Sequence, residues 1–264
     1  MRTKEIMELL EAFAPTGLAC EYDNVGLLAG DPEKEVKSVY ISLDADDRAV
    51  EAAAEGGFDL LLTHHPLIFK PLKSINEDRF IGRRLRRLIR SDVNYYALHT
   101  NFDMAKGGMA DLAAAMIGLG QSKPLQPAVG SGMDGLGIGR VGELKEEMTL
   151  EELCQLVKSA FDLPNVNVYA AGSGQEKIRR AAISPGSGSS VLMDAVRTGV
   201  SVLITGDIGH HEGIDTAASG VTVIDAGHYG LEHIFIPFME AFLKKNLPGL
   251  EVCAAPMHLP CHMM

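Results

Sequence analysis

Two adjacent histidines, His64 and His65, have the clearest potential for chemistry in this sequence. They follow a short apolar run, Leu60 to Thr63, that is typical of a strand buried on both faces. Pro66 cannot donate a hydrogen bond to a neighbouring strand, so the strand ends just after His65. Neighbouring side chains on a strand point in opposite directions, so one metal ion could bind both imidazoles only if the backbone turned sharply. Two ions could take one each, and an isolated pair could equally form hydrogen bonds at the strand end.

Further histidines and carboxylates follow the ends of other predicted strands. They are Asp44 after residues 39–43, His99 and Asp103 after 94–98, Asp207, His210 and His211 after 200–205, and His228 and Glu232 after 221–225. A spacing of four residues puts His228 and Glu232 on one face of a helix, which is a chelating arrangement. A strand-helix-strand unit makes parallel strands whose carboxyl ends share one edge of a sheet. We therefore expect Asp44 to lie near the first histidine pair, and the clustering of histidines at strand ends indicates a metal site.

The donor atoms of this set define the metal chemistry that we expect. Three imidazoles and two carboxylates suit Zn²⁺, Fe²⁺, Mn²⁺ or Co²⁺ rather than Mg²⁺ alone; these residues are His64, His65, Asp103, His228 and Glu232. Five ligands exceed what one tetrahedral ion needs and suit two divalent ions about 3.5–4 Å apart, with one carboxylate bridging them. Water on such a pair becomes a nucleophile near neutral pH, so hydrolysis is the favoured class of reaction.

An α/β fold with two lobes is expected to position these residues, with mostly parallel central sheets flanked by helices. Residues 118–142 are rich in Gly, Ser and Pro, which indicates a crossing from one lobe into the other. The prediction assigns residues 1–120 and 225–264 to a metal-site lobe and residues 121–224 to a second α/β lobe. Amphipathic spacing predicts helices near residues 6–13, 47–55, 83–90, 109–117, 150–161 and 235–242, and further strands near 166–169, 181–183 and 251–254.

Composition restricts the possible partners and the location. The 264 residues carry a formal net charge of −11, which argues against nucleic acid as the main partner. The five arginines within residues 83–90 are therefore interpreted as a solvated helix face or a subunit contact rather than a phosphate site. The four cysteines are scattered, so we expect reduced thiols. The sequence shows neither an apolar leader nor a stretch long enough to span a membrane, and a cytoplasmic location is expected.

Three weaker candidates have a simpler structural explanation, which is favoured for the first and the last. Asp23 and Asn24, shortly before a glycine, are typical turn formers. The loop 186–190 could hold an anion at a helix start or could be a tight strand-to-helix turn. The C-terminal residues Cys253, His258, Cys261 and His262 could chelate metal, but a frayed terminus is favoured.

The motifs in combination resemble the NIF-three-like dinuclear-metal proteins, which are also labelled GTP cyclohydrolase I type 2 homologues. The matching stretches run in order from about residue 23 to residue 232: Asp23-Asn24-Val25-Gly26-Leu27, His64-His65-Pro66-Leu67-Ile68-Phe69, Leu98-His99-Thr100-Asn101-Phe102-Asp103, Thr205-Gly206-Asp207 with His210-His211, and Gly227-His228-Tyr229 with Glu232. Two departures are Tyr22, where many members have tryptophan, and the lack of a long central insertion.

The resemblance implies a toroidal homohexamer of two-lobed α/β subunits, each with paired metal ions. It also implies that His64, His65, Asp103, His228 and Glu232 are the ligands, with Glu232 as the bridge. His99, His210 and His211 resemble polar residues around the metal pair. They are candidate catalytic residues that relay protons or position a substrate, or they support the ligands.

Two functions of different classes remain open from the sequence. The first is a metal-dependent hydrolase, for which the family label makes ring-opening of GTP, a small-molecule nucleotide, the named reaction. The alternative is a metal-handling or regulatory binding protein without GTP turnover, and a purely structural metal site is a third possibility. The motifs indicate metal binding and do not identify a substrate.

Overall fold

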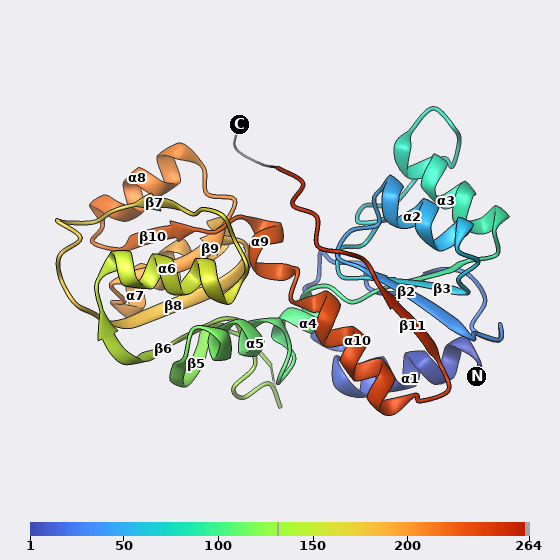
Figure 1. Ribbon diagram of the computed structural model, residues 1–264, viewed down its shortest axis with the longest axis horizontal. Coiled ribbons are helices and arrows are strands. Elements are labelled where there is room, and N and C mark those ends of the chain that lie inside the picture. Colours follow the sequence, from blue (N-terminus) through green and yellow to red (C-terminus); the bar gives the residue numbers. More distant parts are fainter. Residues whose placement is uncertain (131, 262–264) are drawn as a thin grey trace. The chain divides into compact units, whose positions relative to one another are not determined.

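The computed structural model describes residues 1–130 and 132–261, which fold into two compact units (Figure 1). Unit 1 consists of Met1–Ala105 and Phe235–His258, and unit 2 consists of Lys106–Ile234 with residues 259–261. Each unit contains one β-sheet flanked by helices, so the predicted α/β fold is confirmed. His262, considered above as part of a chelating tail, lies outside the described residues.

The sheet of unit 1 has five strands in the order β1-β4-β3-β2-β11. Their bounds are Gly26–Ala29 (β1), Ser38–Ser42 (β2), Leu60–Thr63 (β3), Asn94–Ala97 (β4) and Glu251–Ala254 (β11). Strands β4, β3, β2 and β11 are parallel, and β1 pairs with β4 in the antiparallel sense. The carboxyl ends of β2, β3 and β4 therefore meet at one edge of the sheet, which is where the predicted site residues of this unit follow.

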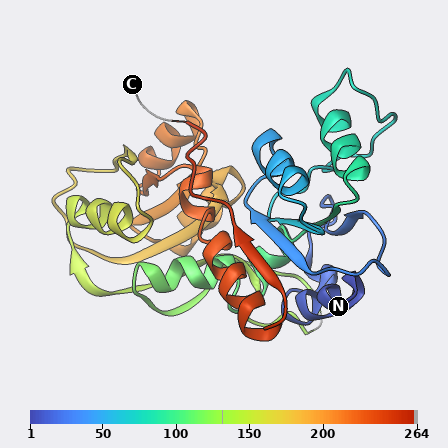
Figure 2. The ribbon, with the colours of Figure 1, turned by 45° about the vertical axis from the view of Figure 1, so that its right-hand side comes forward.

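Helices cover both faces of this sheet. Successive side chains of its buried strands point to opposite faces, so both faces need a covering layer. In Figure 1, α2 (Asp47–Glu55) and α3 (Phe80–Arg90) lie on one side, and α1 (Thr3–Phe13) and α10 (Phe235–Asn246) lie on the other. Tyr95 packs in the core cluster under α2 and α3, whereas its neighbour Tyr96 donates a hydrogen bond from its hydroxyl to Glu11 of α1. The turned view of Figure 2 shows α10 beside β11. Two short helices, η1 (Thr16–Leu18) and α4 (Thr100–Met104), complete the unit.

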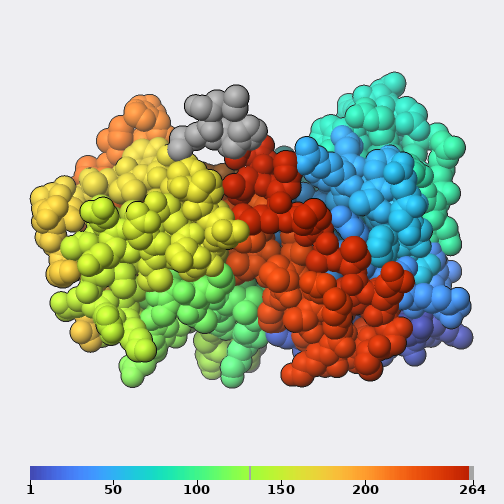
Figure 3. Space-filling model, viewed as in Figure 1, coloured from blue at the N-terminus to red at the C-terminus, as the bar shows by residue number. Residues whose placement is uncertain are grey.

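The arginines of α3 form ion pairs with its neighbour. Arg84 Nε and Arg87 Nε each lie 2.8 Å from a carboxylate oxygen of α2, on Asp47 and Glu51. The space-filling view of Figure 3 shows α2 and α3 as one continuous surface. This arrangement is consistent with a solvated, ion-paired helix face.

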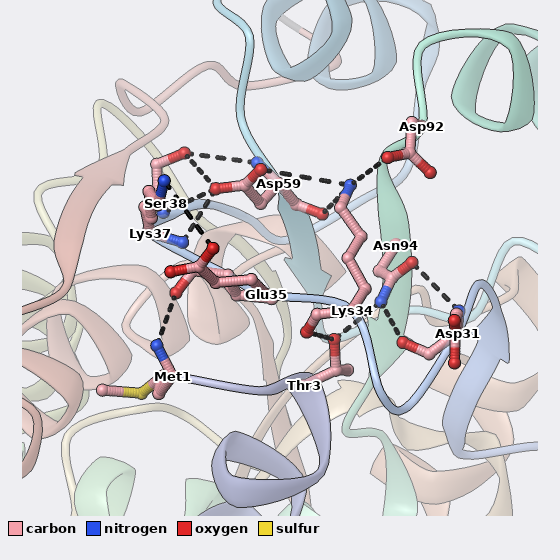
Figure 4. Close-up of polar contacts among 11 residues, drawn as sticks. Met1, Thr3, Asp31, Lys34, Glu35, Lys37, Ser38, Asp59, Asp92 and Asn94 are labelled. Carbon is pink, nitrogen blue, oxygen red and sulfur yellow. Dashed lines mark hydrogen bonds and ion pairs between the residues drawn. The ribbon is translucent and has the colours of Figure 1, made fainter.

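Polar contacts join the amino ends of the strands in unit 1, at the sheet edge opposite to the predicted site (Figure 4). The buried Asn94 side chain donates to Thr3 Oγ1 (2.7 Å) and to the Asp31 carbonyl (2.8 Å). Asp59 Oδ2 accepts hydrogen bonds from the backbone of Lys37 and Ser38. These contacts satisfy the polar groups at this edge within the fold itself.

Unit 2 contains a six-stranded sheet in the order β5-β6-β8-β9-β10-β7. The strands are Leu119–Pro127 (β5), Gly137–Met148 (β6), Asn167–Tyr169 (β7), Ile178–Ser187 (β8), Val202–Gly206 (β9) and Thr222–Asp225 (β10). Among the described residues of this unit, the β8–β9 and β9–β10 pairings are parallel and the other three are antiparallel, so this sheet is mixed rather than mostly parallel.

Residues 118–142, interpreted above as a crossing between lobes, instead form most of the antiparallel pair β5 and β6. Their glycines permit close contact between the strands. A Cβ atom on Gly137 would lie 2.2 Å from the Gln126 carbonyl oxygen, and one on Gly142 would lie 2.6 Å from the Gly120 carbonyl oxygen. At these two positions glycine is therefore explained by close packing of the strands.

The helices of unit 2 pack on this sheet. They are α5 (Met109–Met116), α6 (Leu150–Ala160), η2 (Gly188–Val191), α7 (Leu192–Thr198), α8 (His210–Ala218) and α9 (His228–Glu232). The predicted assignment of 106–120 and 225–234 to the first lobe differs from the division into units, because α5 packs on β5, β6 and β8 and α9 packs on β8 and β9.

No helix in the described part of the chain, residues 1–130 and 132–261, is long and apolar enough to cross a membrane. The cytoplasmic location remains a prediction.

Candidate metal centre

The backbone turns sharply at the end of β3 and brings His64 and His65 side by side in unit 1. The backbone N–H groups of both residues donate to the same acceptor, the Leu43 carbonyl, at 3.1 and 2.9 Å. The His65 carbonyl in turn accepts hydrogen bonds from Thr63 Oγ1 (2.8 Å) and the Tyr95 hydroxyl (3.0 Å). The ring centroids of the two histidines are 4.9 Å apart. The sharp turn that would let both imidazoles serve one site is therefore present.

The three histidines at this edge of the unit 1 sheet, His64, His65 and His99, each have Nδ1 within hydrogen-bond distance of an oxygen. His64 Nδ1 lies 2.7 Å from the Leu98 carbonyl, His65 Nδ1 lies 2.7 Å from Asp44 Oδ1, and His99 Nδ1 lies 2.8 Å from Asp23 Oδ1. Carbonyl and carboxylate oxygens only accept hydrogen bonds, so in the neutral imidazole the proton is assigned to Nδ1. The lone pair is then on Nε2 in all three rings, which is the state that coordinates a metal ion.

Asp23 anchors the third histidine and the start of α4. Its carboxylate accepts hydrogen bonds from His99 Nδ1 and from the backbone N–H (3.0 Å) and hydroxyl of Thr100. Burial works to raise the pKa of Asp23, but the hydrogen bonds from His99 and Thr100 outweigh it and lower the pKa to about 2. Asp23 is therefore a carboxylate that orients His99, and not merely a turn former.

Unit 1 thus assembles four of the predicted residues at the carboxyl edge of its sheet. One ligand atom from each of His64, His65 and His99 lies within 4.8 Å of the others. Asp103, on α4, places Oδ1 3.5 Å from His64 Nε2. The His64 side chain is fully buried, whereas those of His65, His99 and Asp103 remain about one fifth exposed.

Unit 2 supplies a second pair of donors on α9. His228 Nε2 lies 2.9 Å from Glu232 Oε2, as the spacing of four residues on a helix predicts. His228 Nδ1 lies 2.9 Å from Asp207 Oδ2, so this histidine has the same carboxylate support as His65 and His99. Asp207 has a left-handed backbone (φ 56°), an uncommon conformation for a residue with a side chain and one that is enriched at functional sites.

Two glycines let α9 approach the sheet of unit 2 closely. A Cβ atom on Gly206 would lie 2.4 Å from the His228 backbone nitrogen, and one on Gly186 would lie 2.4 Å from Glu232 Oε1. Asp225 joins the neighbouring loops, because its carboxylate accepts from the backbone N–H groups of Ile208 (3.1 Å) and Gly227 (2.9 Å). The position of the Glu232 carboxylate therefore depends on the absence of a side chain at residue 186.

Replacing Gly186 with alanine should weaken metal binding by about 10- to 100-fold, the usual effect of disturbing the surroundings of a ligand. The new methyl group would displace the Glu232 carboxylate. Gly199→Ala is the matched control, because Gly199 also has a positive φ (65°) but no atom within 4 Å of the added methyl. Both variants should lose about 1–2 kcal/mol of stability from backbone strain. Titration against a chromophoric chelator measures the affinity, and equal affinities in the two variants would contradict this role for Gly186.

His210 and His211 occupy the first turn of α8 in unit 2. Both side chains are exposed, and their ring centroids are 5.2 Å apart. Neither belongs to the groups of possible metal ligands found among the described residues. A catalytic role for either residue remains a prediction.

The donor atoms fit divalent metal ions. Two atoms bound to one ion at about 2.1 Å lie about 3.0–3.5 Å apart. The His64 Nε2 to Asp103 Oδ1 distance of 3.5 Å and the His228 Nε2 to Glu232 Oε2 distance of 2.9 Å are close to this range. With the protons on Nδ1, each pair brings a nitrogen lone pair next to a carboxylate oxygen, an arrangement that a cation stabilises.

Sequence reasoning missed several supporting residues. In the sequence, Gly186 is part of a loop that could hold an anion, and Asp23 has the pattern of a turn former. The roles of Asp207 and Tyr95 in orienting histidines depend on contacts between distant segments. Asp44 and Asp207 were expected at strand ends, and each lies within hydrogen-bond distance of a histidine Nδ1.

Comparisons with known proteins agree over nearly the whole chain. The family model of Duf34/NIF3 (NGG1p interacting factor 3) matches residues 1–259. A protein of Clostridium perfringens named "GTP cyclohydrolase 1 type 2 homolog" is 37% identical over 88% of this chain and 87% of its own length. One of the same name from Clostridium acetobutylicum is 35% identical over 96% and 93%. The crystal structure of a Bacillus cereus protein related to NIF3 covers 100% of this chain and 99% of its own, with 25% identity and a TM-score of 0.92.

Proposed function

Because the chain belongs to the Duf34/NIF3 family, we propose that it is a metal-dependent hydrolase that binds two divalent ions per chain. The ligands in this proposal are His64, His65, Asp103, His228 and Glu232, with Glu232 as the bridge. The observation that carries it is the shared support of the three proposed histidine ligands, since Nδ1 of His64, His65 and His228 is held by an oxygen at 2.7–2.9 Å. Structural histidines have no common need for this arrangement, whereas metal ligands do.

In the proposed hydrolysis, the residues of the chain have distinct roles. Divalent ions held by these ligands would supply a water molecule acidified enough to act as a nucleophile near neutral pH. His65 is held in its coordinating orientation by Asp44, and His228 by Asp207. His99, with its Nδ1 proton donated to Asp23, can accept a proton at Nε2 and is proposed as the general base or proton relay.

We propose GTP as the first substrate to test, because the curated relatives are named GTP cyclohydrolase 1 type 2 homologues. The reaction is hydrolytic opening of the imidazole ring of the purine. A homohexamer, implied by the family resemblance, is part of the same proposal, and light scattering of the metal-loaded protein measures it.

The decisive experiment compares metal-free protein with protein reloaded with Zn²⁺, Mn²⁺, Co²⁺ or, without oxygen, Fe²⁺. Chromatography follows GTP, ATP and a panel of phosphoesters. We expect at least one metal-loaded form to consume GTP and the chelator-treated form to be inactive. If no loaded form consumes any compound, while bound metal passes readily to an acceptor apoprotein, the metal-handling alternative replaces the hydrolase.

A further inference from the structure

Two aromatic rings of unit 1 are exposed next to the histidine set. Tyr22 is 66% exposed and Phe69 is 39% exposed. Their ring centroids are 6.2 Å apart at an interplanar angle of 65°. Phe69 in turn lies 6.1 Å from the His99 ring, and His99 lies 5.6 Å from His65. A continuous series of rings therefore leads from solvent to the proposed metal ligands.

The loops that carry the two rings are fixed by hydrogen bonds. Asn24 donates from Nδ2 to the Ile68 carbonyl, which joins the loop of Tyr22 to the loop of Phe69. The backbone N–H of Asp23 donates to the Cys20 carbonyl (2.9 Å), and the Asp23 carboxylate holds His99 and Thr100. The backbone next to each ring is thus held by hydrogen bonds within unit 1.

Exposed aromatic rings on rigid loops beside a polar site are suited to binding a ligand. Binding sites combine apolar and aromatic surface with a few oriented polar groups, and here both occur within two loops of one unit. A planar heterocycle stacks on such rings without needing a specific pattern of hydrogen bonds. A simple phosphoester or an aliphatic substrate gains nothing comparable from them.

We propose that Tyr22 and Phe69 form a stacking site that places the planar heteroaromatic part of the substrate, such as a nucleobase, beside His99. Because the rings are inclined at 65°, one stacks on the face of the base and the other contacts its edge. This inference rests on the proposed hydrolase function and deepens it, because it assigns the substrate to the heteroaromatic class. The pair selects for the base and is separate from the residues that bind metal.

The test measures binding of two probes to the full-length, metal-loaded protein by calorimetry. The probes are 7-deaza-GTP, which keeps a planar base but has no hydrolysable imidazole ring, and inorganic tripolyphosphate, which has no base. The wild type should bind 7-deaza-GTP more tightly. Tyr22→Ala and Phe69→Ala should each weaken 7-deaza-GTP binding by about 5- to 100-fold and leave tripolyphosphate binding unchanged. Tyr22→Phe and Phe69→Tyr should retain the wild-type preference.

Phe80→Ala is the matched control, because Phe80 is a 53% exposed ring of unit 1 that packs against Arg84 on α3. It should bind both probes like the wild type. The inference is overturned if the alanine variants keep the wild-type preference for 7-deaza-GTP, or if their affinity for both probes falls equally. It is also overturned if the variants change only the oligomeric mass, because the rings would then be a contact with a second copy of the chain. Base selectivity without GTP turnover would instead overturn the proposed reaction and leave this stacking site standing.

Discussion

His64→Ala is expected to remove most of the bound metal and to reduce any metal-dependent hydrolysis by at least about 10³-fold. Loss of a residue that only supports a ligand costs about 10- to 100-fold in metal affinity or activity, and loss of the ligand itself should cost more. His64 is fully buried, and both ring nitrogens face oxygens: Nδ1 the Leu98 carbonyl at 2.7 Å and Nε2 the Asp103 carboxylate at 3.5 Å. Neither alanine nor water can restore both contacts in that space.

Elemental analysis after dialysis measures the metal content of the His64 variant. Because the substitution also leaves a buried cavity, circular dichroism and the urea midpoint of the metal-free protein must show that the variant is folded. His64→Gln is a second variant that fills more of the space. Full metal content in either folded variant would contradict the assignment of His64 as a ligand.

Glu232→Gln is expected to lower the metal content from two ions per chain to one. A carboxylate can bridge two cations because it shares one negative charge between two oxygens, whereas the amide offers one neutral oxygen. The shape of the side chain is almost unchanged, so the packing of the buried Glu232 against Gly186 should persist. The effect therefore isolates the charge of the bridge from the packing of α9.

Elemental analysis at saturating metal gives the stoichiometry of the Glu232 variant. Glu143→Gln is the matched control, because Glu143 is an exposed glutamate of the same unit that pairs with Arg179 at 3.1 Å. It should retain the wild-type stoichiometry. Two ions bound to Glu232→Gln would refute the bridging role, and one ion bound to the wild type would refute the dinuclear centre.

The part of the fold that the sequence could predict is the part with strong apolar periodicity. Apolar periodicity predicts the buried strands β2, β3, β4, β9 and β10. It also predicts the amphipathic helices α1, α2, α3 and α6. Thr149 and Glu152 form a capping box at the start of α6, with Thr149 Oγ1 accepting from the Glu152 backbone and Glu152 Oε2 accepting from the Thr149 backbone. Local sequence determines these features, so local reasoning finds them.

The strands that local patterns do not predict are defined by backbone pairing with another strand. β5 contains Pro124, Pro127 and Lys123, and reads as a loop by composition. It is a strand because its backbone pairs with β6 over most of its length. The short β1 is likewise defined by antiparallel pairing with β4, some 70 residues later in the chain. No periodicity within either segment signals that pairing.

For the candidate site, residue type and position at strand ends were sufficient to find the donors of each unit. The orientation of those donors was not predictable in the same way. The turn that places His64 next to His65 depends on the Leu43 carbonyl, and the support of His99 depends on a carboxylate 76 residues earlier. Such contacts exist only in the folded chain.

The discontinuity of unit 1 has a consequence for synthesis of the protein on the ribosome. Residues 106–234, which form nearly all of unit 2, emerge as one uninterrupted segment, whereas the sheet of unit 1 lacks β11 until residues 251–254 have been translated. Until then β2 is an unprotected edge of a nascent sheet, with unsatisfied backbone groups that invite pairing with other chains. The edge of the unit 1 sheet at β2 is therefore covered only when the last strand of the sheet has been made.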